Sequence, residues 1–136
     1  MAGGGWGYLY WQDLSAAPQA KSQVSKFLED ASTEKYEEAY NLSASSLKSQ
    51  VTKEQFSGAL AAVQKILYVG YISQQQTSIK YKVNFWQPTV YSYSGVITYS
   101  DGDKGSVTAL LVREEGELKI KSIKVDISPE RYKKYK

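Results

Sequence analysis

The apolar residues near the end of the chain change sides of their strand at one position. In the stretch GELKIKSIKVDI, residues 116–127, Leu118 and Ile120 alternate with lysines and so share one face of an extended strand. The apolar residues that follow are odd-numbered instead: Ile123, Val125 and Ile127. An extra residue would return both sets to the same face, so the pattern predicts a β-bulge around Lys121 and Ser122. Because a bulge bends its strand, we expect a curved sheet that wraps around another part of the domain.

The first half of the chain supplies helices that could close such a sheet. Apolar spacing predicts an amphipathic helix over residues 17–31 and a second helix capped by Ser32 or Thr33. Thr52 and Gln55 form a capping box that opens a third helix. The apolar face of this third helix has helical spacing: Phe56, Leu60, Val63 and Leu67.

The second half of the chain has a period of two, which predicts strands. A short strand at 67–73 is expected to end at the glutamine run 74–76, and further strands follow in 77–86, 89–100, 106–114 and 116–127. The DGDKG stretch predicts a turn in which Gly102 and Gly105 take positive φ, and Glu115-Gly116 predicts a tight hairpin. The chain is therefore predicted to be one α+β domain, with helices followed by an antiparallel meander.

Two stretches resemble a known superfamily. EKYEEAYNLSASSLKSQVTKEQF and EGELKIKSIKVDI are similar to the second and third helices and the final strand of the NTF2-like (cystatin-like α+β cone) superfamily. The resemblance spans residues 18–128, and it is strongest to small bacterial envelope or lipoprotein-like members of unknown function. It implies three N-terminal helices packed on a curved antiparallel sheet around a cavity, and it allows a homodimer through the sheet. It implies no activity, since this fold hosts enzymes, transport factors and structural modules.

Three segments are expected from the composition. Residues 1–14 form an aromatic and glycine-rich arm, residues 15–130 form the cone domain, and residues 131–136 form a solvated, frayed basic tail. The arm carries four aromatic residues typical of the interfacial end of a membrane helix: Trp6, Tyr8, Tyr10 and Trp11. We therefore expect the remnant of a membrane anchor, with the domain on the extracytoplasmic or periplasmic side. The alternative is an arm that packs on its own domain, or an artificial extension.

Catalysis is disfavoured by what the sequence lacks. It has no His and no Cys, which removes the usual general base, the commonest metal ligand and thiolate chemistry. Enzymes of the resembled superfamily use a pocket His, or an Asp beside a Tyr. All five aspartates are predicted to be solvated and outside the cavity: Asp13, Asp30, Asp101, Asp103 and Asp126. We therefore expect no catalytic residue, no metal and no cofactor.

Tyrosine is the unusual residue, with 12 copies. Six of them are predicted to point into the cone: Tyr36, Tyr40, Tyr81, Tyr91, Tyr93 and Tyr99. They either line a pocket for a flat or amphipathic ligand, or fill the cone as core with their hydroxyls at its rim. Core filling is the favoured interpretation.

Lysines mark the opposite face of the sheet. Five are predicted to face away from the core: Lys80, Lys82, Lys119, Lys121 and Lys124. A net charge of only +3 and 14 carboxylates argue against nucleic acid as a partner. The sequence therefore favours a non-catalytic accessory or protein-interaction domain, near a membrane, that binds another protein, itself or a membrane surface. The alternative is a small-molecule binding module that uses the tyrosine-lined cavity.

Overall fold

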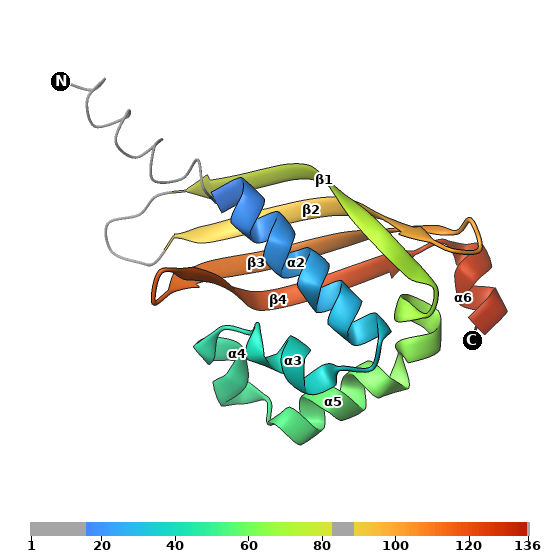
Figure 1. Ribbon diagram of the computed structural model, residues 1–136, viewed down its shortest axis with the longest axis horizontal. Helices are drawn as coiled ribbons and strands as arrows, with labels where there is room; N and C mark the ends of the chain where they lie inside the picture. Colours follow the sequence, from blue (N-terminus) through green and yellow to red (C-terminus); the bar gives the residue numbers. More distant parts are fainter. Residues whose placement is uncertain (1–15, 83–88, 136) are drawn as a thin grey trace.

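A curved antiparallel sheet crossed by one long helix, with a short helix at one end of the sheet, forms the domain (Figure 1). The structure is a computed structural model, and it describes residues 16–82 and 89–135. The strands follow one another as a meander: β1 (Tyr71–Lys82), β2 (Val90–Tyr99), β3 (Lys104–Glu114) and β4 (Glu117–Ile127). The helices are α2 (Ala16–Ser32), α3 (Tyr36–Asn41), α4 (Ser45–Gln50), α5 (Lys53–Ala62), the π-helix η1 (Gln64–Tyr68) and α6 (Pro129–Tyr135). The predicted α+β class is confirmed.

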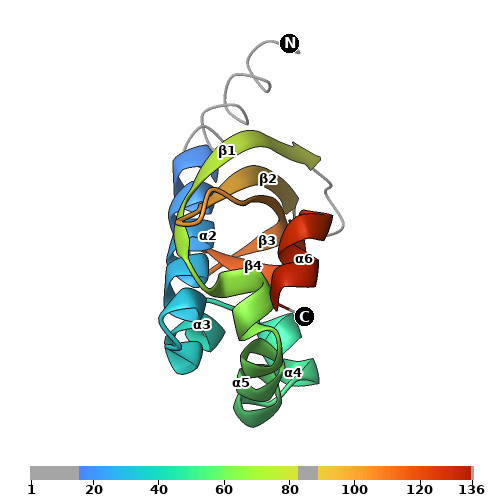
Figure 2. The ribbon, with the colours of Figure 1, turned by 90° about the vertical axis from the view of Figure 1, so that its right-hand side faces the viewer.

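The bulge predicted in the last strand is present. Leu110 of β3 pairs with Ser122, and Leu111 pairs with Ile120, so Lys121 has no partner in the register. The extra residue keeps Leu118 and Ile120 buried. Irregularities also interrupt the pairing of β1 with β2, and β1 arches over the sheet in Figure 2. These irregularities occur in both outer strands, where they bend the sheet around its concave face.

Helix α2 covers that concave face and contacts both outer strands, β1 and β4. One stripe of the helix is fully buried: Ala20, Val24, Phe27, Leu28 and Ala31. The edge of the Phe27 ring packs on Phe56 of α5, with ring centroids 5.9 Å apart. Helices α3, α4 and α5 pack beyond α2, at the β4 side of the molecule (Figures 1 and 2). The helix count therefore differs from the expected three: one long helix, α2, covers the sheet, and three shorter helices pack beyond it.

Two helix boundaries also differ from the prediction. Ser32 belongs to the end of α2, where its hydroxyl donates to the carbonyl of Glu29, and it caps no following helix. The capping box of Thr52 and Gln55 is confirmed at the start of α5. That helix ends at Ala62, and Leu67 lies in the π-helix η1 instead.

The turns follow the sequence at two of three glycines. Gly102 has a φ of 87°, and Glu115 and Gly116 form the β3–β4 hairpin with φ values of 53° and 83°. Gly105 was wrongly expected to need positive φ, since it lies within β3. It is required for space, because a Cβ there would lie 2.7 Å from the carbonyl oxygen of Asp126.

Strand β1 and the C-terminus were also misjudged. The glutamines at 74–76 do not interrupt β1, which runs from Tyr71 to Lys82. The expected frayed tail is wrong for residues 131–135, which continue helix α6 from Pro129. Its Arg131 side chain is completely buried. Both segments are polar in sequence, and both are held by partners that lie far away along the chain.

Candidate functional site

The six candidate tyrosines lie in three places rather than around one cavity. Tyr36 and Tyr40 are half-buried in α3, where their hydroxyls donate to the Gln64 side chain and the Val51 carbonyl. Tyr93 and Tyr99 are fully buried core residues. Tyr91 is also buried, but its neighbour Tyr81 is 39% exposed and contacts it with ring centroids 5.6 Å apart. None of the six lines the grooves described below.

The hydroxyls of the two core tyrosines are hydrogen bonded to protein groups. Tyr99 donates to the Leu67 carbonyl at 2.6 Å. Tyr93 donates to Oε1 of Gln74 at 2.7 Å, and Nε2 of Gln74 donates to the Ser25 hydroxyl at 2.8 Å. Burial raises the pKa of both tyrosines, so they are neutral at ordinary pH. These rings fill the cone, and their hydrogen bonds join the sheet to α2 through Gln74 and Ser25 and to η1 through Leu67.

Gln74 was missed because it sits in a glutamine run that resembles a loop. It is only 7% exposed, and it faces Gly95 of β2, which has no side chain to occupy that space. A buried amide is stable only when its hydrogen bonds are made, and both ends of Gln74 are paired. The signal in the sequence was the glycine within an otherwise regular strand, which marks a close approach.

A polar groove of about 400 Å³ opens between α2 and the start of β1. Most of its lining carries hydroxyl or amide groups: Ser25, Glu29, Ser32, Thr33, Tyr71, Ile72, Ser73 and Gln74. Burial raises the pKa of Tyr71 to about 12, with a further contribution from the nearby Glu29 carboxylate. We call this the hydroxyl groove. Its chemistry suits a ligand that presents hydroxyl or amine groups, since it offers several hydrogen-bond partners and one carboxylate.

The lysines lie on the outward face of the sheet, as predicted for those whose side chains are described. Lys80, Lys121 and Lys124 are exposed, and Lys119 is half-buried. Lys119 pairs with Glu117 at 3.2 Å and Lys124 pairs with Asp126 at 3.7 Å. Lys82 ends β1, and its side chain lies outside the described part. Between these edge lysines, β2 and β3 present small polar and apolar side chains: Ser92, Ser94, Val96, Thr98, Ser106, Thr108, Leu110 and Val112.

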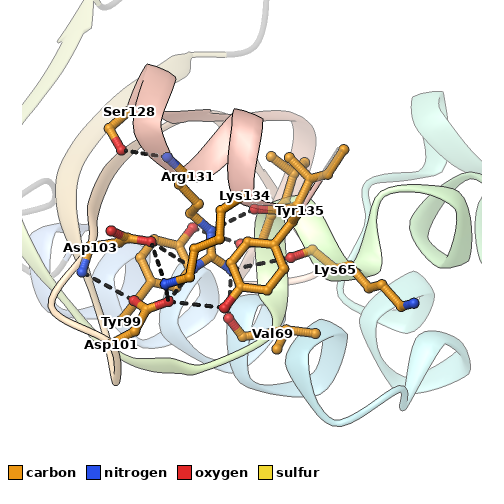
Figure 3. Close-up of polar contacts among 11 residues, drawn as sticks. Lys65, Val69, Tyr99, Asp101, Asp103, Ser128, Arg131, Lys134 and Tyr135 are labelled. Atoms are coloured by element: carbon orange, nitrogen blue, oxygen red, sulfur yellow. Dashed lines mark hydrogen bonds and ion pairs between the residues drawn. The ribbon is translucent and has the colours of Figure 1, made fainter.

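Arg131 is the centre of a charged cluster at the end of the sheet (Figure 3). Its guanidinium donates to the carbonyls of Ile66 and Val69 at 2.6 and 2.5 Å, and more weakly to Lys65 at 3.4 Å. The Tyr99 and Tyr135 rings lie on either side, with centroids 3.7 and 4.7 Å from the guanidinium carbon. This cluster could not be predicted from the sequence, because its members come from three separate parts of the chain.

The β2–β3 turn supplies the negative charge of this cluster. Asp101 and Asp103 each place a carboxylate oxygen 3.6 Å from Nη1 of Arg131. Lys134 and Tyr135 donate to Asp101 at 2.8 and 3.0 Å. The hydrogen bond from Lys134, followed by that from the Asp103 backbone, holds the pKa of Asp101 well below its usual range. The two aspartates were expected to be solvated, but they fix helix α6 to the turn.

The other candidate groups lie apart from these clusters. Asp126 is exposed, as expected, whereas Asp30 is 4% exposed and pairs with Lys26 at 3.4 Å, so its expected solvation was wrong. Within residues 16–82 and 89–135, no cluster of metal-ligating side chains and no helix suited to crossing a membrane is found. Trp6, Tyr8, Tyr10 and Trp11 lie outside the described residues.

Comparison with known proteins identifies the fold. No protein-family model and no curated protein matches the sequence. A solved protein of unknown function from Nostoc punctiforme, described as having a cystatin-like fold, is similar with a TM-score of 0.59. It is 10% identical, and the match covers 83% of this chain and 91% of that one. Aln2 from a Streptomyces species gives a TM-score of 0.54 at 12% identity, with 83% and 90% covered. The chain therefore has a cystatin-like fold, and identities this low carry nothing about activity.

Proposed function

We propose that the chain is a non-catalytic interaction domain that binds a partner protein through the outward face of its sheet. The supporting observation is the contrast between the two faces of the sheet. The concave face is filled by buried tyrosines whose hydroxyls are used internally. The outward face is available for contact, and its edge strands carry the exposed Lys80, Lys121 and Lys124.

The charge of this face favours an acidic partner. Lys80 and Lys121 have no ion-pair partner among the described residues, whereas Lys119 and Lys124 are each offset by a neighbouring carboxylate. A homodimer that stacked two such faces would bring lysines toward lysines, which costs free energy. Another protein that carries carboxylates is therefore favoured over a second copy as the partner of this face.

The place of the domain in the cell rests on the sequence. The aromatic arm of residues 1–14 resembles the interfacial end of a membrane anchor. The motifs of the domain resemble small bacterial envelope and lipoprotein-like proteins. We propose an extracytoplasmic, membrane-associated domain, without enzymatic activity or a cofactor.

Photo-crosslinking in the native cells tests the partner face. A photoreactive residue at Thr108, exposed at the centre of the outward face, should give a crosslinked partner, and one at the exposed Glu38 of α3 should not. The double variant Lys80→Glu, Lys121→Glu should abolish the product. Lys21→Glu, Lys48→Glu makes the same change of net charge on the helices and should leave it intact. A crosslinked product of twice the chain's mass would establish a homodimer. Loss of the product in both double variants would refute binding through the outward face.

The hydroxyl groove supports a second candidate function, a small-molecule binding module. Gln74 connects its Ser25 to Tyr93 in the core, so a ligand there would be linked to the centre of the domain. Native mass spectrometry from gentle to denaturing conditions tests this. A mass excess that is released on denaturation, and that Tyr71→Ala removes, would establish the module. A bare chain would favour the interaction domain.

A further inference from the structure

An apolar groove of about 500 Å³ runs beside helix α6. One wall is formed by η1 and the residue before it, the other by α6, and the end of β4 lies between them. The lining is mostly apolar and half-exposed: Val63, Ile66, Leu67, Val125, Asp126, Ile127, Pro129, Tyr132 and Lys133. Tyr132 is 47% exposed on the α6 wall. We call this the α6 groove.

The two walls of the α6 groove are fixed to each other. Arg131 belongs to α6, and its guanidinium donates to the carbonyl of Ile66 within η1 and to that of Val69, the residue after η1; Figure 3 shows the contact with Val69. The same side chain is held by the two aspartates of the β2–β3 turn. The groove is thus preformed, and a ligand that enters it does not have to order its walls.

Two charged residues line the groove, Lys133 and Asp126. The carboxylate of Asp126 is paired with Lys124 at 3.7 Å, so Lys133 is the charge that is left for a ligand among the described lining residues. Helix α6 has 7 residues, so its wall is about 10 Å long, or about two turns of a helix laid alongside it. A partner helix of that length would insert apolar residues at positions i, i+3 or i+4, and i+7.

We infer that the α6 groove receives an amphipathic helix of a partner protein, with apolar side chains in the groove and carboxylates facing Lys133. The inference rests on the proposed function, and it names a second contact for an acidic partner. The groove meets the outward lysines at Asp126, which lines it and pairs with Lys124. One acidic partner could therefore contact both surfaces.

Other occupants fit the groove less well. A bilayer surface is flat, whereas the α6 groove is a hollow between two walls. A second copy's α6 would place lysines against lysines.

Binding of two model helices tests the inference. The probes are fluorescent amphipathic peptides, one with a leucine face and glutamates, the other with the same leucines and lysines. We expect the glutamate peptide to bind the full chain in fluorescence anisotropy, and the lysine peptide to bind about tenfold more weakly at low salt. Tyr132→Asp should weaken the glutamate peptide about tenfold, and Tyr132→Phe should not. Lys133→Glu should reverse the preference, with Lys21→Glu as the matched control, and circular dichroism should show each variant folded.

Each other outcome overturns the inference. Equal affinity for both peptides would show that the groove does not select an acidic partner. An unchanged affinity of folded Tyr132→Asp for the glutamate peptide would show that the peptide binds elsewhere. No binding of the glutamate peptide would refute a helix site. Binding to phosphatidylcholine–phosphatidylglycerol vesicles that Tyr132→Asp abolishes, without peptide binding, would identify a lipid surface. The Lys80→Glu, Lys121→Glu variant should still bind the peptide, so failure here and failure of the proposed sheet interface are separable.

Discussion

Gln74 of β1, inside the cone, and Arg131 of α6, at the end of the sheet, are both buried polar side chains, but their partners differ in kind. Gln74 is neutral, and it bridges a tyrosine and a serine hydroxyl in a space opened by Gly95. Arg131 is charged, and it gathers three carbonyls, two aromatic rings and two carboxylates. The neutral group joins α2 to the sheet, whereas the charged group attaches a terminal helix. The cone should therefore depend on close packing, and α6 on electrostatics.

The largest effect is expected from Arg131→Met. The variant leaves the carbonyls of Ile66 and Val69 without their donor and removes the buried cation beside Asp101 and Asp103, which keep only the exposed Lys134, so the free energy of unfolding should fall by about 3–5 kcal/mol. Urea denaturation measures the change. Arg131→Lys should recover only part of it, because an ammonium cannot stack between rings or reach several acceptors in one plane. A loss below about 1 kcal/mol, the scale of an exposed ion pair, would show that the cluster does not stabilise the fold.

Gly95→Ala tests the packing around Gln74. The added Cβ would lie 2.9 Å from the carbonyl oxygen of Gln75 and closer still to the Gln74 side chain, so the neighbouring strand must shift. We expect a loss of about 1–3 kcal/mol in urea denaturation. Gly58→Ala is the matched control, since it is exposed in helix α5 and a Cβ there meets nothing within 4 Å. The free energy of unfolding of Gly58→Ala should rise by about 0.5–1 kcal/mol. Equal effects of the two variants would contradict the close approach of β1 to Gly95.

Tyr93→Phe removes one hydrogen bond and leaves the ring in place. Oε1 of Gln74 then lacks its donor in a buried site, so we expect a loss of about 1–2 kcal/mol by urea denaturation. Tyr99→Phe is the companion variant and leaves the Leu67 carbonyl without its donor. Unchanged stability together with altered ligand retention in native mass spectrometry would instead support the small-molecule function.

The sequence predicted those parts of the fold that local patterns encode. The bulge at Lys121 was visible because a shift in a period of two has no other economical cause, and the capping box of Thr52 depends on neighbours three residues apart. Gln74 and Arg131 could not be predicted in the same way. Their partners come from distant segments of the chain. In the sequence, Gln74 lies in a polar run typical of a loop, and Arg131 lies in a basic run typical of a solvated tail. The candidate site was the least predictable part, because a groove is lined by side chains that share no local sequence pattern.

The smallest effect should appear in acid, and it should separate the two clusters. Because the pKa of Asp101 is lowered in the folded protein, its contribution to stability is present above the ordinary carboxyl pKa of about 3.9 and is lost as the pH falls through the folded value. No comparable acid titration involves the neutral Gln74 and Tyr93. Tyr135 ring signals in NMR should therefore change before those of Tyr93 as acid is added. Lys134→Gln removes the main cause of the lowered pKa, so release of α6 should move to higher pH. Simultaneous change of both rings would mean that α6 and the cone unfold as one unit.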